Sequence, residues 1–178
     1  MKEMNFIQAM EIISYIDSSS DCMRDIYKEF CEKGRAVDRK IIDNILKKHN
    51  VEYESAKEEF LDIILSYAMI IVKDSVISAS ESSDIKYLKN LFKINKGDFF
   101  ELDNQQIKEI IQQQLYKLYI DNSIEKHEAL FKSGLQDLFD LTNDQMAIFV
   151  NPMAYDALER GADKMHLKTV FPDFKTTD

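Results

Sequence analysis

The 178-residue sequence contains little glycine and proline, with only four and two residues. These residues mark the tight turns between short strands, so a chain with so few of them favours long helices. No segment shows the strand-like alternation of apolar and polar residues bounded by turn residues. We therefore predict an all-α protein.

Cysteine is equally scarce. Cys22 and Cys31 lie nine positions apart, which fits neither a disulfide framework nor a common zinc-ligand spacing. No histidine lies close enough in the sequence to complete a metal site. We expect both cysteines to serve as small apolar core residues.

Long apolar runs are missing as well. The longest nearly unbroken run, Ile63 to Val72, is about half as long as a bilayer-spanning helix. Glu3 and Glu11 interrupt the N-terminal segment where a signal peptide would have its apolar centre. We expect a buried core helix at 63–72, no membrane insertion and a cytoplasmic location.

Basic residues are outnumbered, since 23 Lys and Arg face 32 Asp and Glu, for a net charge of −9. An acidic surface repels phosphate backbones, so we expect no nucleic-acid partner. The local basic group Lys47, Lys48 and His49 is interpreted as a solvated helix end. No Gly-rich phosphate loop, H-E-x-x-H or C-x-x-C motif occurs, and no residue is proposed as catalytic.

Apolar periodicity and capping residues predict seven to nine helices arranged as stacked helical hairpins. They cover about residues 5–15, 21–33, 39–49, 55–73, 79–93, 104–120 and 126–140, a short helix within 141–150, and a last helix that starts at Asn151 and Pro152 and ends at Gly161. The helix at 55–73 is apolar nearly all round, which predicts neighbours on more than one side. We expect a single domain at 1–162 and an irregular tail at 163–178 that packs on the domain or on a partner.

An offset of 47 residues aligns segment 60–96 with segment 107–143. The matched pairs include Asp74 with Asp121, Glu81 with Glu128, Phe60 with Ile107, Leu88 with Leu135, Leu91 with Leu138, Phe92 with Phe139 and Ile94 with Leu141. Apolar matches are common between amphipathic helices, but a shared Asp and Glu are not. A shorter echo lies at 37–51. We predict an internal repeat of helical hairpins, because one such hairpin cannot bury its apolar side alone.

The acids of the two turns have a structural explanation. Ser78 and Glu81 have the spacing of a capping box, in which each side chain accepts a hydrogen bond from the other residue's backbone N–H group. Glu128 occupies the third helical position in the second copy, where the positive end of the helix dipole favours a carboxylate. We prefer this capping role for both glutamates.

A divalent metal at Asp121, Glu125 and Glu128 is the alternative. An EF-hand that starts at Asp121 would need glycine at its sixth position and glutamate at its twelfth. The sequence has Lys126 and Lys132 there, so this motif is excluded. A different oxygen cluster around the same three acids stays open.

The turns read DSVISASE at 74–81 and DNSIEKHE at 121–128, with Asp, Ile and Glu at the same positions. This spacing resembles the acidic turn, similar to DGxIxxxE, of the tellurite-resistance protein TerB superfamily. The resemblance covers about residues 60–149, and both copies lack the glycine after Asp. It implies a stress-associated module of paired helices whose acidic residues bind metal. The residues concerned are Asp74, Glu81, Asp121 and Glu128.

We expect a non-enzymatic, TerB-like binding or scaffold module that takes a protein partner and needs no cofactor. One alternative is an acidic inhibitor or immunity-type protein that covers a basic partner. The other is a metal-dependent enzyme with a site between helices. A scaffold would expose an apolar patch of several hundred Å². An inhibitor would lose partner affinity with added salt, and an enzyme would gather acids or histidines from separate helices in one pocket.

Overall fold

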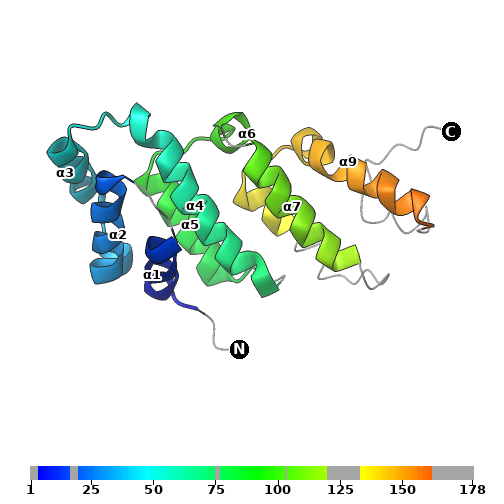
Figure 1. The fold of residues 1–178 in the computed structure, drawn as a ribbon, viewed down its shortest axis with the longest axis horizontal. Helices are drawn as coiled ribbons and strands as arrows, with labels where there is room; N and C mark the ends of the chain where they lie inside the picture. Colours follow the sequence, from blue (N-terminus) through cyan, green and yellow to red (C-terminus); the bar gives the residue numbers. More distant parts are fainter. Residues whose placement is uncertain (1–3, 17–19, 75–76, 103, 120–132, 162–178) are drawn as a thin grey trace. The chain divides into compact units, whose positions relative to one another are not determined.

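The structure is a computed structural model that describes residues 4–16, 20–74, 77–102, 104–119 and 133–161. These residues form helices joined by short connections and contain no strand (Figure 1), so the all-α prediction is confirmed. None of the described helices is long and apolar enough to cross a bilayer. The predicted tail at 163–178 lies outside the described residues.

The chain falls into two compact units, residues 1–95 (unit 1) and 96–178 (unit 2). The single domain predicted at 1–162 stays a prediction. Unit 1 contains α1 (Phe6–Ile16), α2 (Asp21–Lys33), η1 (Gly34–Ala36), α3 (Arg39–His49), η2 (Glu54–Ala56), α4 (Lys57–Ile71), η3 (Val72–Asp74) and α5 (Ala79–Leu91). Figure 1 shows that α2 lies beside α3 and α4 beside α5.

Side-chain caps explain where three helices of unit 1 begin. Ser20, Asp38 and Ser78 precede α2, α3 and α5, and each accepts a hydrogen bond from a backbone N–H group in the first turn. Such a cap satisfies one of the N–H groups that a helix start leaves without a partner. Gly34 ends α2 with a φ of 55°, a conformation that glycine adopts without steric cost.

The core of unit 1 is built around α4. Phe60 on this helix stacks on Phe92, with ring centroids 4.3 Å apart, and Phe30 of α2 meets Phe92 edge-on at 6.0 Å. Residues around most of the circumference of α4 are buried: Phe60, Leu61, Ile63, Ile64, Leu65, Tyr67, Ala68 and Ile71. The prediction of a central helix with neighbours on more than one side is confirmed, since α1 and α5 both pack on it.

Unit 2 contains α6 (Asp98–Leu102), α7 (Asn104–Tyr119), helical residues 133–138 and α9 (Asn143–Glu159). Phe99 is fully buried and contacts Phe139, with ring centroids 5.8 Å apart. Phe100 contacts Phe149 at the same centroid distance. These two phenylalanines of the short segment before α7 therefore pack within unit 2.

One helix replaces the two that the sequence predicted between residues 141 and 160. Helix α9 begins after Thr142, whose side chain forms a capping box with Gln145, and it continues through Pro152. The prediction that Asn151 and Pro152 start a new helix was wrong. A proline inside a helix removes one backbone hydrogen bond, but the apolar residues Met146, Phe149, Val150 and Ala154 are all buried along α9. This burial holds the helix together across the proline.

The closing turn of the predicted repeat recurs in the two units. Three turn N–H groups donate to carbonyls of the preceding helix: Phe92 to Leu88, Lys93 to Asn90 and Ile94 to Lys89 in unit 1, and Phe139 to Leu135, Asp140 to Asp137 and Leu141 to Gln136 in unit 2. Each donor and each acceptor in unit 1 lies 47 positions before its counterpart in unit 2. The central residues Lys93 and Asp140 share a positive φ, of 43° and 53°. The repeat thus extends to backbone detail at the hairpin ends, whereas the overlay of Asp74 on Asp121 stays a prediction because 120–132 lie outside the described residues.

The shorter upstream echo has the same ending. Asn50 follows α3 with a φ of 53°, and its N–H group donates to the carbonyl of Lys47. The N–H group of Val51 donates to the carbonyl of Leu46. This pattern of a left-handed residue after the last turn is a common helix ending, and here it follows three helices.

Candidate functional site

The acids proposed as metal ligands, Asp121, Glu125 and Glu128, all lie outside the described residues. Elsewhere in the described part of the chain, no three His, Cys, Asp or Glu side chains are grouped to hold a metal ion. The capping prediction for Glu81 is confirmed. Its carboxylate accepts the N–H of Ser78 at 2.8 Å, and its own N–H donates to the Ser78 hydroxyl at 3.2 Å.

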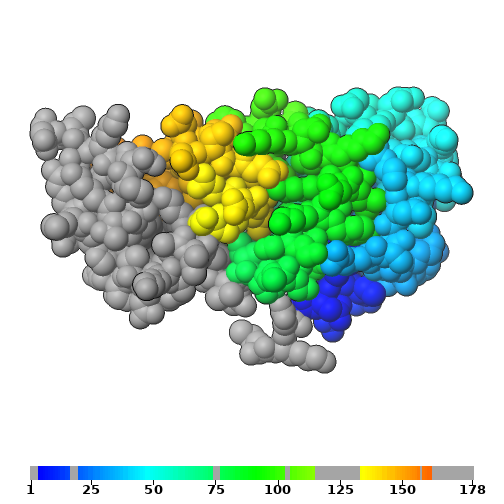
Figure 2. Space-filling model, turned by 180° about the vertical axis from the view of Figure 1, so that it is seen from behind, coloured from blue at the N-terminus to red at the C-terminus, as the bar shows by residue number. Residues whose placement is uncertain are grey.

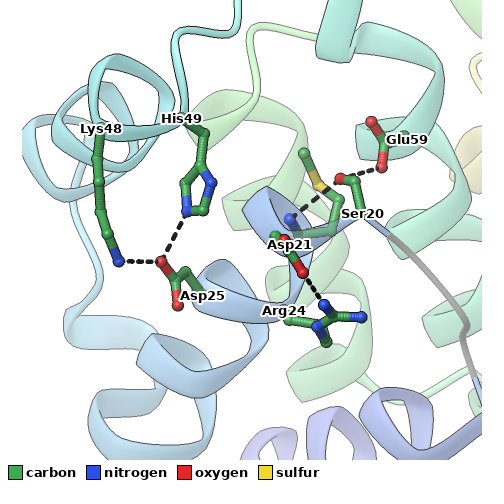
Figure 3. A network of polar contacts seen from close by, with 8 residues as sticks. Ser20, Asp21, Arg24, Asp25, Lys48, His49 and Glu59 are labelled. Atoms are coloured by element: carbon green, nitrogen blue, oxygen red, sulfur yellow. Dashed lines mark hydrogen bonds and ion pairs between the residues drawn. The ribbon is translucent and has the colours of Figure 1, made fainter.

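A polar cluster joins α2 to α3 (Figure 3). One carboxylate oxygen of Asp25 lies 2.6 Å from Nζ of Lys48 and 2.8 Å from Nε2 of His49. These hydrogen bonds, first to Lys48 and then to His49, lower the pKa of Asp25 to about 2. The helix end at Lys47, Lys48 and His49, which we predicted to be solvated, is therefore only partly so. Lys48 and His49 bind Asp25 on the neighbouring helix α2.

Ser20 and Glu59 form a second contact in the same view. The Ser20 hydroxyl donates to Glu59 at 2.6 Å and accepts the N–H of Met23 at 3.4 Å. Figure 3 shows Ser20 and His49 bonded to different acids, Glu59 and Asp25. A serine nucleophile of the Ser-His-Asp type donates its hydroxyl proton to a histidine. The Ser20 hydroxyl instead donates to the Glu59 carboxylate, and this hydrogen bond links α2 to α4. The two contacts link the three helices α2, α3 and α4 at the surface.

A buried acid connects α5 to α4 and η1. Asp84 is 5% exposed and accepts the Tyr67 hydroxyl at 2.6 Å, while its other oxygen lies 3.2 Å from the Arg35 guanidinium. Burial, followed by the hydrogen bond to Asp84, raises the pKa of Tyr67. Sequence reasoning missed this group. The available signal was that Asp84 shares the buried side of α5 with Glu81 and Leu88.

Helix α1 is anchored to unit 1 by aromatic packing. The ring of Phe6 lies 5.7 Å from that of Phe30, 5.6 Å from that of Tyr67 and 5.7 Å from that of Tyr87, so one side chain reaches α2, α4 and α5. Ile7 covers Gly34, where an added Cβ would come within 3.1 Å of the isoleucine side chain. One side of α1 is therefore firmly packed.

The outward side of α1 exposes large apolar residues together with the polar Asn5, Gln8 and Glu11. Tyr15 is 90% exposed and Ile16 79%, and the adjoining Met4 and Ile12 are 40% and 39% exposed. We call these four residues the α1 surface. In Figure 2, part of α1 (dark blue) is visible at the lower edge of unit 1. Single exposed apolar residues are ordinary in proteins, so the feature of interest is that three of these four lie on one short helix and the fourth just before it.

Three polar side chains at α1 form hydrogen bonds with the nearby backbone. Gln8 accepts the N–H of Asn5 at 3.2 Å, while Asn5 accepts the N–H of Gln8 at 3.0 Å. The Ser14 hydroxyl donates to the carbonyl of Glu11 at 2.7 Å. Glu11 is the only charged residue in α1. A partner that covers the α1 surface would therefore also have to accommodate the exposed Glu11 carboxylate.

The cysteine prediction is half confirmed. Cys22 is buried and Cys31 is half-buried, and neither forms a disulfide. Burial raises the pKa of both thiols, and nearby carboxylates add to the effect, Glu59 for Cys22 and Glu11 for Cys31. A raised thiol pKa disfavours the nucleophilic thiolate, so the environment of both cysteines is that of packing residues.

Comparison of this chain with protein-family models, curated proteins and solved structures gives no significant match.

Proposed function

We propose that this protein is a non-enzymatic helical binding module, TerB-like and stress-associated, which holds a protein partner on the α1 surface. One observation carries the proposal: Tyr15 and Ile16 are 90% and 79% exposed on a helix whose other side is packed in the core. Tyrosine is among the residues that most often provide binding energy at protein interfaces, and aromatic residues and methionine are enriched there. The helical hairpins and the capped Asp-Ile-Glu turn at 74–81 support the TerB-like part of the proposal.

The polar clusters favour a binding module over the metal-dependent enzyme. Asp25 is engaged by Lys48 and His49, and Asp84 by Tyr67 and Arg35. Each acid thus has a structural partner on another element. The α1 surface, by contrast, consists of large apolar side chains that are exposed in the structure.

Site-specific photo-crosslinking in cells tests the proposal. A benzophenone amino acid replaces Tyr15, and in a matched control it replaces Lys40, an exposed polar position on α3. We expect position 15 to give discrete protein adducts and position 40 to give none of them. The proposal fails if position 15 gives no adduct, either with another protein or with a second copy of this chain.

A further inference from the structure

We infer that the partner on the α1 surface is a second copy of this chain, so that the protein forms a symmetric dimer through α1. This inference rests on the proposed function, because it names the partner of the same surface. A two-fold interface uses one patch twice, so the patch must be complementary to itself. The α1 surface meets this condition, because the isoleucine and methionine side chains of each copy can pack on the tyrosine ring of the other copy.

The area of the surface fits a small dimer interface. The two most exposed side chains, Tyr15 and Ile16, offer on the order of 350 Å² together, and Met4 and Ile12 add roughly 150 Å². Two copies would then bury about 1,000 Å² in total, which is the lower limit for a specific interface. This total assumes that all four side chains become fully covered. Interfaces at this lower limit are typical of weak, transient complexes, so we expect a dimer that dissociates on dilution.

The effect of salt on binding distinguishes this dimer from a complex with a basic partner. Each chain carries a net charge of −9, and Glu11 lies on the exposed side of α1 beside the apolar residues. Two copies therefore repel each other, and added salt screens the repulsion, because the Debye length falls from about 10 Å at 0.1 M to about 3 Å at 1 M. A dimer should tighten with salt. A basic partner, bound as an acidic inhibitor would bind it, should be released by salt.

Sedimentation velocity on the purified full chain, at about 1 to 100 µM and at low and high salt, tests the inference. We expect a concentration-dependent dimer whose dissociation constant falls several-fold as salt rises. The double variant Tyr15→Glu with Ile16→Glu should be monomeric over the whole range. The matched control is Ile148→Glu, which removes a 58% exposed isoleucine from α9 and should leave the dimer unchanged.

Charge complementation provides the decisive measurement. A second double variant, Tyr15→Lys with Ile16→Lys, should also be monomeric alone. If α1 meets α1, an equimolar mixture of the Glu and Lys variants should form mixed dimers at low salt, because acidic and basic side chains then lie together in one small interface. Circular dichroism checks that both variants keep the helical content of the wild type.

The inference is overturned if the wild type stays monomeric at about 100 µM in both salts, or if the mixture of variants does not associate. In that case, adducts of position 15 with a different protein would still support the proposed function. If position 15 gives no adduct at all, the proposed function falls with the inference.

Discussion

In unit 1 the hairpin of α4 and α5 buries Tyr67 against Asp84, whereas in unit 2 the position that matches Tyr67 is Gln114, which is 4% exposed. The sequence has Phe131 at the position that matches Asp84. The partner that neutralises Asp84 is Arg35 of η1, a residue outside the repeated hairpin. A buried acid at this position therefore depends on Arg35 of η1, which lies outside the repeated hairpin.

The closing turns of the two hairpins, by contrast, have the same backbone structure. Their hydrogen bonds join backbone atoms, so Lys93 and Asp140 can occupy the same left-handed position although their side chains differ. The residues beneath the turns, Leu88 and Leu135, are both fully buried. Backbone geometry and apolar volume are thus shared between the units, while buried polar groups are individual to each.

The largest expected effect comes from the shared apolar position. Leu88→Ala and Leu135→Ala each leave a cavity at a fully buried site, which costs about 3 kcal/mol of unfolding free energy. If the two units are separate folding units, each variant should destabilise its own unit alone. Hydrogen exchange measured by mass spectrometry should show faster exchange in α4 and α5 for Leu88→Ala, and in α7 and α9 for Leu135→Ala. Equal acceleration in both units by both variants would mean that they unfold as one.

A somewhat smaller effect should follow from breaking the buried polar group that only unit 1 uses. Asp84→Ala removes the acceptor of the Tyr67 hydroxyl and the ion-pair partner of Arg35, whose guanidinium keeps its hydrogen bond to the Ser83 hydroxyl. Loss of one member of a buried pair costs about 3–5 kcal/mol, but the Arg35 side chain is 47% exposed and water can solvate it. We therefore expect a loss of about 2–3 kcal/mol in urea unfolding.

Tyr67→Phe is the matched comparison for that acid. It removes the hydroxyl and keeps the ion pair between Asp84 and Arg35, so the expected loss is only about 1 kcal/mol. Equal losses for the two variants would show that the hydroxyl, and not the charge, accounts for the effect.

The closing turns allow a gain of stability to be tested. A non-glycine residue in the left-handed region costs about 1–2 kcal/mol, and glycine removes this cost at the expense of unfolded-chain entropy. Lys93→Gly removes this backbone cost, but it also removes the contact of the Lys93 ammonium with the Tyr53 ring, whose centroid lies 5.4 Å away. We therefore expect a net stabilisation of unit 1 of at most about 0.5 kcal/mol. Lys86→Gly, at an exposed position within α5, is the control and should destabilise by about 1 kcal/mol. A loss of stability in Lys93→Gly would show that the contact with Tyr53 outweighs the cost of the left-handed backbone.

Much of this fold could be predicted from the sequence, because helix starts and ends depend on nearby residues. The N-caps Asp38 and Ser78 and the terminating Gly34 set the bounds of their helices locally. The error at Pro152 arose because burial along α9 outweighs the local preference of proline for a first turn. Contacts such as Asp25 with His49 could not be predicted, since they depend on which helices become neighbours.

The candidate site was only partly visible in the sequence for the same reason. The apolar content of α1 is evident from its residues, but periodicity alone does not say that Tyr15 and Ile16 face outward while Phe6 and Ile13 face the core. That distinction requires the positions of α2, α4 and α5. The acids that the sequence did single out, Asp121, Glu125 and Glu128, keep their capping and metal alternatives open.

The smallest expected effect concerns the surface cluster that links α2 and α3 in unit 1. Asp25 has a pKa of about 2 in the folded protein, below the value of about 3.9 for an aspartate in an unfolded chain. Because the folded pKa is lowered, the contribution of Asp25 to stability is complete above about pH 4 and is lost as the pH falls toward 2. Asp25→Asn should therefore reduce the slope of unit 1 stability against pH between about 5 and 2, as measured by urea midpoints. Asp144→Asn, which removes a carboxylate from α9 of unit 2, is the control and should leave the unit 1 slope unchanged. Parallel wild-type and Asp25→Asn curves would show that Lys48 and His49 hold α2 to α3 without help from the Asp25 charge.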